Sequence, residues 1–345
     1  MMVPIVFLVL CIGGFLVSGL TIEFVANEMI FRLSRNLILV MSLIIPVISG
    51  MGLNFGIVLG AMAGQAGLIF IVNHKIGGIG GIFIAMLVST PIAILLGWMV
   101  GKVLNKAKGR EMITSMILGF FANGIYQLIF IVMAGRVFPI KNKKILMKSG
   151  YGLKNTIDLI SIRKKLDMLF FGEYIPKVPV MTFIFIAILF ILMYLLLKTK
   201  LGQDMRAVGQ NMHVANISGI DVDRTRLISI IISTVLAAWG QIVYLQNMGT
   251  LNTFSNHEQV GLFAVASLLI GGASVEKASW KEALIGTFLF HLLFIISPIA
   301  GQNLIGNAQI GEYFRVFVAY GVIGLALVLH AWEKNKQQNL ERLKG

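Results

Sequence analysis

Side-chain amides interrupt several apolar segments of this sequence, and two phenylalanines stand beside one of them. An amide donates and accepts hydrogen bonds, so within an apolar segment it costs free energy unless a partner or water satisfies it. Such groups suit the binding of a polar, uncharged solute, but they also join one helix to another, and the sequence leaves both interpretations open. For the aromatic rings, packing is the simpler interpretation and stacking on a solute the alternative. The candidate residues for lining a translocation pathway for such a solute are Asn54, Gln65, Phe120, Phe121, Asn123, Gln127, Gln241 and Gln246.

No constellation for catalysis accompanies these amides. The sequence has no Gly-x-x-x-x-Gly-Lys-Ser/Thr phosphate loop, and no paired groups for acid–base or nucleophilic chemistry at helical spacing. His257-Glu258 lacks the second histidine of a zinc-protease pattern, and the isolated His291 fits a packed side chain better than a metal ligand. Cys11 is the only cysteine, which excludes an intramolecular disulfide. We therefore expect no enzyme, and no metal or cofactor bound by this chain.

The composition places the chain in a membrane. Hydrophobic residues make up 57% and charged residues 13% of the 345 residues, and the mean hydropathy is +0.87. A helix of about 20 apolar residues crosses the hydrocarbon core and satisfies its own backbone there. We predict an all-α, polytopic membrane protein with about ten transmembrane or re-entrant helices. The candidate segments are residues 3–20, 37–49, 57–72, 79–100, 113–134, 180–197, 227–245, 260–273, 283–299 and 313–332.

Residues 1–345 are expected to form a single transmembrane domain. Segment 3–20 has no basic stretch before it and no cleavage site followed by a soluble domain, so we interpret it as a span and not as a signal peptide. Three polar segments depart from the apolar pattern. They are an insertion at residues 135–179, a region at residues 198–226 and a tail at residues 333–345.

The net charge of +14 does not indicate nucleic-acid binding, because the basic residues lie between apolar segments and form no separate domain. Contact with anionic membrane lipid explains them better. Cytoplasmic loops usually carry the excess of Lys and Arg, but the two alternating sets of loops are nearly balanced in this chain. One set comprises Arg32, Arg35, Lys75, Arg315 and the basic insertion. The other comprises region 198–226, the loops around residues 102–110 and 277–281, and the tail. Charge alone therefore does not orient the protein.

Glycines cluster in two places along the apolar segments. Residues 50–56 interrupt one apolar stretch, and Gly60, Gly64 and Gly67 follow. Glycine permits both broken helices and close helix packing, so each glycine has two interpretations. Segment 260–273 is too short to span comfortably and indicates a tilted or re-entrant half-helix. Interrupted segments in both halves of the chain are typical of a translocation pathway near the membrane midplane.

The region 198–226 is polar although long apolar segments flank it. Its spaced residues are Arg206, Ala207, Val208, Gly209, Asn211, Ala215, Gly219, Ile220, Val222 and Arg224. Together with residues 52–65 and 262–274, this pattern resembles the permease subunits of binding-protein-dependent ABC importers, in the branch for ribose-like sugars, nucleosides, riboflavin and branched-chain amino acids. The resemblance covers most of the chain except residues 138–179, and residues 54–56 depart from the more frequent acidic or serine-containing variant.

The resemblance implies that region 198–226 docks in the cytoplasm on an ATP-hydrolysing subunit. The residues themselves allow a helix over 204–214, a break at Gly219 and Asp221, and a cap by Asp223 on the next span. An ordinary solvated loop is the alternative that charge alone suggests. The candidate ATPase-coupling residues are Asp204, Arg206, Gly209, Asn211, His213, Gly219, Asp221 and Arg224.

The resemblance also implies a cytoplasmic (inner) membrane location and a set of partners. These are ATP-binding-cassette subunits that hold ATP and magnesium, a second permease, either related or identical, and an extracytoplasmic binding protein or lipoprotein. Region 198–226 and the tail then lie inside and the basic insertion outside, where it faces the binding protein.

The substrate that we expect is a nucleoside or riboflavin rather than a plain pentose, because the long insertion resembles nucleoside-type permeases. An ion-coupled secondary transporter is the alternative. Such a carrier usually needs a carboxylate within the membrane, and we expect acidic residues such as Glu111 and Glu258 only at the edges of the spans.

Overall fold

The computed structural model describes residues 2–169, 178–307, 309–317, 320–325 and 328. Its described part is predominantly helical, and two short strands, β1 (Thr156–Asp158) and β2 (Thr250–Asn252), pair only with each other. Within this part of the chain, six helical segments are long and apolar enough to span a membrane. The predicted all-α, polytopic membrane architecture is confirmed. The predicted tail at residues 333–345 lies outside the described residues, and the last candidate span, 313–332, lies partly outside them.

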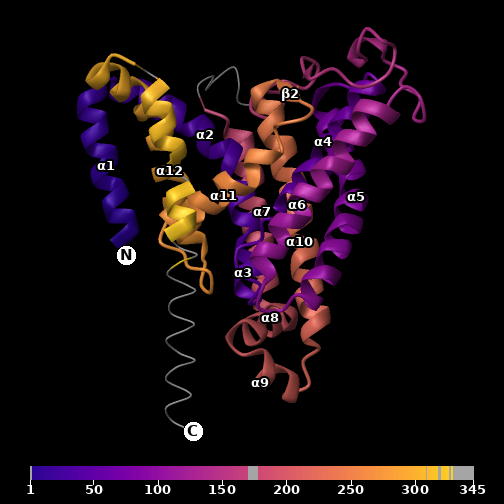
Figure 1. The fold of residues 1–345 in the computed structure, drawn as a ribbon, viewed down its shortest axis with the longest axis vertical. Helices are drawn as coiled ribbons and strands as arrows, with labels where there is room; N and C mark the ends of the chain where they lie inside the picture. Colours follow the sequence, from indigo (N-terminus) through magenta and orange to yellow (C-terminus); the bar gives the residue numbers. More distant parts are fainter. Residues whose placement is uncertain (1, 170–177, 308, 318–319, 326–327, 329–345) are drawn as a thin grey trace. The chain divides into compact units, whose positions relative to one another are not determined.

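The chain forms two compact units by internal contacts. Unit 1 comprises Met1–Met29 and Leu262–Gly345, and unit 2 comprises Ile30–Gly261. In unit 1, α1 (Met2–Ser18) packs along α12 (Trp280–Ile305), and Asn303 Nδ2 donates to the carbonyl of Val17 at 3.0 Å (Figure 1). The unit boundaries fall within α2 (Ile22–Ser42) and α11 (Glu258–Ile270). A single domain over residues 1–345 stays a prediction.

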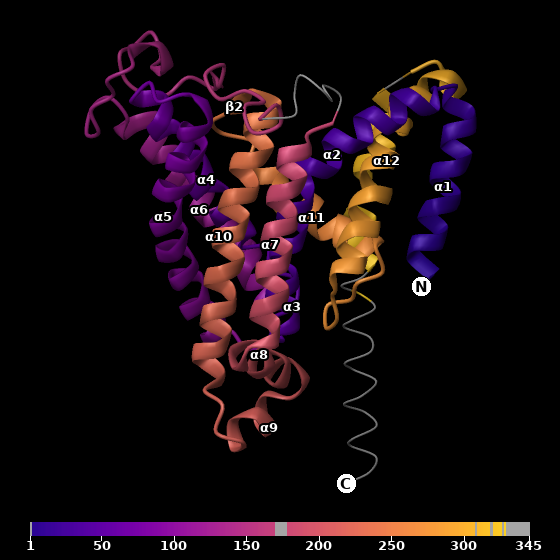
Figure 2. The same cartoon turned by 180° about the vertical axis from the view of Figure 1, so that it is seen from behind.

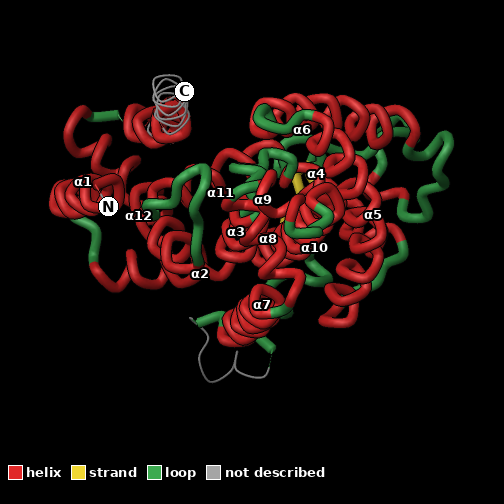
Figure 3. The backbone as a smooth tube through the Cα atoms, turned by 90° about the horizontal axis from the view of Figure 1, so that it is seen from below, coloured by secondary structure: helices red, strands yellow, loops and turns green. Residues whose placement is uncertain are grey.

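Unit 2 is built around three helices, α4, α5 and α10, which pack against one another (Figure 2). A cluster of Leu59, Val100 and Ile230, one residue from each helix, lies in its core. α7 lies at the edge of this unit (Figure 3). The elements of unit 2 beyond α2 and the strands are α3 (Ile44–Ile48), α4 (Ile57–Asn73), α5 (Gly78–Lys106), α6 (Glu111–Gln127), the π-helix η1 (Leu128–Met133), the 3-10 helix η2 (Lys143–Ile145), α7 (Val180–Lys198), α8 (Lys200–Gln210), α9 (Met212–Ile217) and α10 (Val222–Met248).

Glycines let the backbones of α4, α5 and α10 approach closely. A Cβ on Gly60 would lie 2.5 Å from the carbonyl oxygen of Thr234, and one on Gly64 would lie 2.5 Å from that of Ala238. A Cβ on Gly67 would overlap the carbonyl oxygen of Ala85 in α5. Small residues four apart allow such contact between membrane helices. Close packing is therefore the role that the structure gives to these three glycines, whereas residues 49–56 form the predicted interruption between α3 and α4.

The insertion and the pair α8–α9 lie at opposite ends of unit 2 (Figure 1). The insertion is tied down by β1, which pairs with β2 just after α10, and by Asp167. The buried Asp167 carboxylate accepts hydrogen bonds from Thr182 Oγ1 at 2.6 Å, Gln246 Nε2 at 3.1 Å and Asn247 Nδ2 at 2.6 Å. Three donors satisfy the charge, so the insertion is anchored to α7 and α10. Residues 170–177 of the insertion lie outside the described residues.

The start of one predicted span was wrong. α2 begins at Ile22 and not at residue 37, so Arg32 and Arg35 lie in a helix rather than in a loop. Partners make this possible, since Arg35 Nη1 reaches Met248 Sδ at 2.7 Å. The predicted span 113–134 agrees with the helical segment Glu111–Met133, which changes from α-helix to π-helix after Gln127. The 13-residue α11 confirms that segment 260–273 is short, although the helix begins at Glu258.

We predict that Gly64→Ala destabilises the protein, because the new Cβ must displace the α10 backbone. Overpacking of this kind costs about 1–3 kcal/mol. Gly124→Ala in α6 is the control, because no atom lies within 4 Å of its added Cβ. The measurement is thermal unfolding in detergent. We expect a lower midpoint for Gly64→Ala alone, and equal midpoints for both variants would contradict the packing.

Candidate functional site

The region between α7 and α10 folds into two short helices whose starts are fixed by side-chain caps. Thr199 separates α7 from α8 with extended backbone, and its Oγ1 accepts from Gly202 N at 3.4 Å. Asn211 ends α8 and begins α9, since its Oδ1 accepts from the backbone N–H groups of His213 at 2.9 Å and Val214 at 3.0 Å. Asparagine is a preferred N-cap residue. The single helix predicted over 204–214 was therefore wrong, because Asn211 caps a second helix.

Gly219 and Asp221 set the entry into α10. Gly219 has φ +82°, and Ile220 N donates to the carbonyl of Ala215 at 3.0 Å, as in a Schellman motif. Ile220 also packs against the cluster that contains Ala215 and Val208. Asp221 Oδ1 then accepts from Arg224 N at 2.9 Å. Asp221 is thus the cap of α10, and the cap predicted at Asp223 was wrong.

The face of α8–α9 that points away from the helices combines polar and apolar side chains. Arg206, Asn211 and His213 are exposed, as are Val214 at 56% and Ile217 at 72%. Ala215 is buried on the opposite side of α9. These exposed apolar side chains on a short projecting helix make this face a candidate interaction surface. The sequence reasoning did not select Val214 and Ile217, although their spacing relative to Ala215 could have identified them.

Gly209 lies at a contact between backbones. An added Cβ would overlap the carbonyl oxygen of Ile48 and would lie 3.1 Å from Gly50 N. α8 therefore packs directly on the connection between α3 and α4. This contact gives Gly209 a role inside the protein, whereas its predicted role in ATPase coupling stays a prediction.

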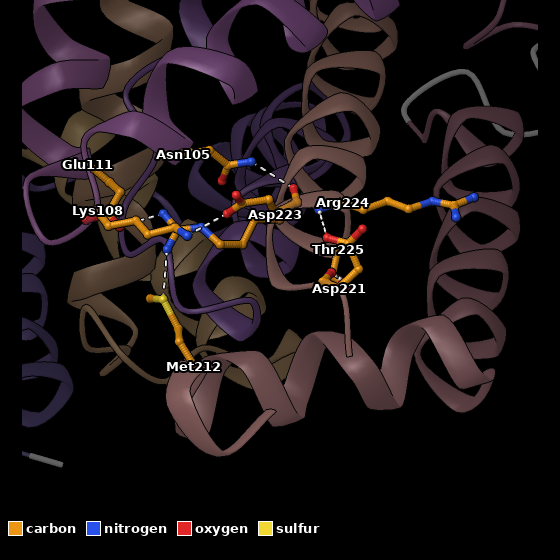
Figure 4. A network of polar contacts seen from close by, with 9 residues as sticks. Asn105, Lys108, Glu111, Met212, Asp221, Asp223, Arg224 and Thr225 are labelled. Atoms are coloured by element: carbon orange, nitrogen blue, oxygen red, sulfur yellow. Dashed lines mark hydrogen bonds and ion pairs between the residues drawn. The ribbon is translucent and has the colours of Figure 1, made fainter. Parts of the chain in front are cut away.

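A buried ion pair joins α6 and α10 beside α9 (Figure 4). Arg226, whose side chain is 0% exposed, contacts Glu111 with Nη2 to Oε1 at 2.5 Å, and its Nη1 lies 3.0 Å from Met212 Sδ. Glu111 is the first residue of α6, where the helix dipole favours a negative charge. One guanidinium group thus connects α6, α10 and α9. Sequence reasoning placed Arg226 only within the polar region 198–226 and Glu111 only at the edge of a span.

Polar contacts extend this network to α5 (Figure 4). Asn105 Nδ2 donates to the carbonyl of Asp223 at 2.7 Å, and Lys108 Nζ lies 2.5 Å from Asp223 Oδ1. Arg224 is exposed, and only its backbone N–H takes part, through the Asp221 cap. The ends of α5, α6 and α10 therefore form one packed base that carries α8 and α9.

A second polar cluster surrounds His257, which the sequence reasoning did not select. Its Nδ1 lies 3.0 Å from Gln65 Oε1 and its Nε2 lies 2.8 Å from Asn123 Oδ1. Tyr126 Oη donates to Gln65 Oε1 at 2.7 Å, and Asn123 Nδ2 donates to Glu258 Oε1 at 2.5 Å. The cluster thus links α4, α6 and the start of α11.

The other amides differ in whether they reach this cluster. Gln127 Nε2 donates to Asn123 Oδ1 at 3.4 Å, and Gln241 Nε2 donates at 3.4 Å to the carbonyl of Asn256, next to His257. Asn54 instead accepts from Gly56 N in the α3–α4 connection, and Gln246 binds Asp167. Phe120 and Phe121, which were predicted to line the pathway, are exposed on α6. For all eight selected residues, the role of lining a pathway stays a prediction.

Comparison with protein families identifies a match over residues 25–328, to the permease component of branched-chain amino acid transport systems. The match covers most of the chain and includes both α8–α9 and the His257 cluster. The chain belongs to this permease family. The predicted multi-pass location in the cytoplasmic membrane agrees with the family and with the six spans in the described part of the chain.

Three curated relatives show the range of this permease family. A xylose/arabinose import permease of Sulfolobus acidocaldarius is 27% identical over 76% of this chain and 64% of its own length. A nucleoside ABC transporter permease of Lactococcus lactis is 28% identical over 43% of this chain and 45% of its own. A tyrosine transport system permease of Clostridioides difficile is 28% identical over 64% of this chain and 67% of its own. The chain covers less than two thirds of the first two relatives. No solved structure matches it.

We predict that breaking the Glu111–Arg226 pair of this permease is strongly destabilising. Removing one partner leaves a buried charge and costs about 3–5 kcal/mol. Glu111→Gln and Arg226→Gln should each lower the midpoint of thermal unfolding in detergent, whereas the double variant Glu111→Leu/Arg226→Met should recover much of the loss. Lys108→Gln, which removes an exposed pair with Asp223, is the control and should change little. Equal midpoints for the single variants and the control would contradict the importance of the pair.

Proposed function

We propose that this chain is the membrane-spanning subunit of an ATP-driven importer that carries a small polar solute. The observation that carries the proposal is the capped pair α8–α9, which rests on the ends of the spans and exposes Arg206, His213, Val214 and Ile217. Membership of the permease family supports the same function. A rigid element of this kind fits a groove on a partner and transmits its motion to α6 and α10 through Arg226.

In this proposal, ATP and magnesium are bound by separate ATP-binding-cassette subunits. Two permeases, identical or related, sit on two such subunits, and an extracytoplasmic binding protein or lipoprotein delivers the solute. Closure of the ATPase dimer moves α8–α9 and changes which side of the membrane has access to the pathway, because ATP binds the two conformations with different affinity. The curated relatives named for xylose, arabinose and nucleosides support a sugar or a nucleoside as the solute. Riboflavin carries neighbouring hydroxyl groups on its ribityl chain, as these solutes do on their sugars, and stays within the proposal.

Affinity purification of the chain from its native membrane in mild detergent tests the proposal. We expect an ATP-binding-cassette protein and its ATPase activity to accompany the wild type. Ile217→Asp places a charge on the exposed apolar face and should remove the ATPase, as should Arg206→Glu. Ile160→Asp alters an equally exposed residue of the insertion and is the control. A chain that purifies alone and drives uptake by an ion gradient would instead support the secondary transporter.

We propose further that the basic insertion contacts the binding protein. Lys141, Lys143, Lys144 and Lys148 are exposed, and the insertion that carries them is fixed to α4 and α10 by backbone contacts such as Lys141 N to Asn73 Oδ1 at 2.8 Å. A fixed cationic surface attracts an acidic partner and loses this attraction as salt rises.

Replacing these four lysines with glutamine should reduce the amount of binding protein recovered with the complex by about tenfold at low salt, consistent with lost charge pairs. Four exposed lysines of the opposite end, Lys102, Lys106, Lys198 and Lys200, provide a variant with the same change in net charge. Equal recovery with both quadruple variants would show that only net charge matters, and would remove the insertion from the docking site.

A further inference from the structure

Glu258 occupies an unusual place for a carboxylate. Its backbone begins α11, but its side chain accepts from Asn123, which lies at the middle of the span Glu111–Met133. Glu258 is exposed in unit 2. The sequence reasoning placed it at a span edge, which agrees with its place as the first residue of α11, while its carboxylate contacts the middle of another span. A charged side chain that faces lipid near the bilayer centre costs about 3 kcal/mol or more, so such residues face protein or a water-filled cavity. The face of α6 that carries Asn123 therefore borders protein or a water-filled cavity rather than lipid.

The hydrogen bonds around His257 have a defined direction. The Glu258 carboxylate accepts from Asn123 Nδ2, so Asn123 Oδ1 faces His257 Nε2, which must carry a proton. Burial disfavours the charged imidazolium, so Nδ1 is without a proton and accepts from Gln65. The Gln65 amide then presents Nε2 both to His257 and to the Tyr126 hydroxyl oxygen, which accepts from it rather than donates. This assignment exchanges the N and O positions of the Gln65 amide, and such exchanges are set by hydrogen bonding.

The cluster retains unused hydrogen-bonding capacity. Gln65 and Gln241 are both 0% exposed. Among the described residues, one amide atom of Gln65 and the Oε1 atom of Gln241 have no hydrogen-bond partner. A buried polar group without a partner costs about 1–3 kcal/mol, so a solute that satisfies it gains free energy. The exposed Glu258 carboxylate supplies further acceptor positions beside them.

An apolar surface adjoins these polar groups. Phe120, Asn123 and Gln127 lie three and four residues apart and therefore share one face of α6. Phe120 is 72% exposed. A carboxylate beside amides and an aromatic ring suits a solute with hydroxyl groups on one side and C–H groups or a flat ring on the other. The same carboxylate repels an anionic group.

We propose that Glu258, Asn123, Gln65, His257 and Phe120 form a recognition site for neutral solutes with adjacent hydroxyl groups. The inference rests on the proposed function and narrows it to a sugar, or a solute that carries one such as a nucleoside, and away from amino acids. Glu258 accepts from two neighbouring hydroxyl groups, Gln65 and Asn123 complete their hydrogen bonds, and His257 positions both amides.

Saturation-transfer NMR on the purified permease with the subunits that accompany it tests this site without a binding protein. The probes are D-ribose and uridine, their 2-deoxy and 2′-deoxy analogues, and L-tyrosine. We expect ribose or uridine to bind the wild type, and Glu258→Gln to raise its Kd by about tenfold, as for one lost charge-assisted hydrogen bond. The preference for the hydroxylated over the deoxy probe should shrink in the same variant. Glu312→Gln, which alters a carboxylate of unit 1, is the control.

If ribose binds and uridine does not, the site recognises the free sugar. If uridine binds and ribose does not, the site recognises the nucleoside. Either result supports the site. The site is overturned if the wild type and Glu258→Gln bind the probes with equal affinity, if only L-tyrosine binds, or if no probe binds. It is also overturned if Glu258→Gln keeps solute binding but makes that binding independent of sodium or pH. Recovery of an ATPase with the chain is scored separately. The importer function therefore stands if only the site fails, and the site stands if only the ATPase is missing.

Discussion

The constraint on which this structure depends is that polar groups enclosed by apolar helices must find partners. Most of the chain avoids the problem, because its helices are apolar and approach one another through glycines such as Gly60 and Gly64. Buried charges therefore stand out: Arg226 pairs with Glu111, and Asp167 accepts from three donors. Each buried charge joins segments that are far apart in sequence, and each lies where a polar element meets the helices. The partners of these charges fix how α8–α9 and the insertion are held.

The Arg226 contacts explain how a small element can act on long helices. α9 carries Met212, which touches the same guanidinium group that binds Glu111 at the start of α6. Gly209 has no side chain and therefore lets α8 pack directly on the connection before α4. In the proposed function, a displacement of α8–α9 reaches three helices of unit 2, because Arg226 and Gly209 contact them directly. Packed backbones transmit strain because protein interiors have low compressibility.

Sequence reasoning identified what periodicity and local chemistry determine. The apolar segments, the interruption at residues 50–56, the short α11 and the break at Gly219 all follow from hydropathy and backbone preferences. It did not identify Asn211 as a cap within region 198–226, nor the partners of Arg226 and His257. The Asn211 cap is local, and its position before a short helix could have identified it. The Glu111–Arg226 pair and the bonds of His257 to Gln65 and Asn123 join residues more than a hundred positions apart, and no local pattern encodes them. Four of the selected amides, Gln65, Asn123, Gln127 and Gln241, nevertheless meet around one histidine.

The central claim is that α8–α9 is the surface through which an ATPase moves this permease. Photo-cross-linking in intact cells tests it most directly, with a benzoylphenylalanine in place of Ile217 and, for comparison, in place of Ile160 at the opposite end of unit 2. The account predicts a covalent adduct with an ATP-binding-cassette protein from position 217 and none from position 160. No ATPase adduct from position 217, in cells where the chain is inserted and stable, would contradict it.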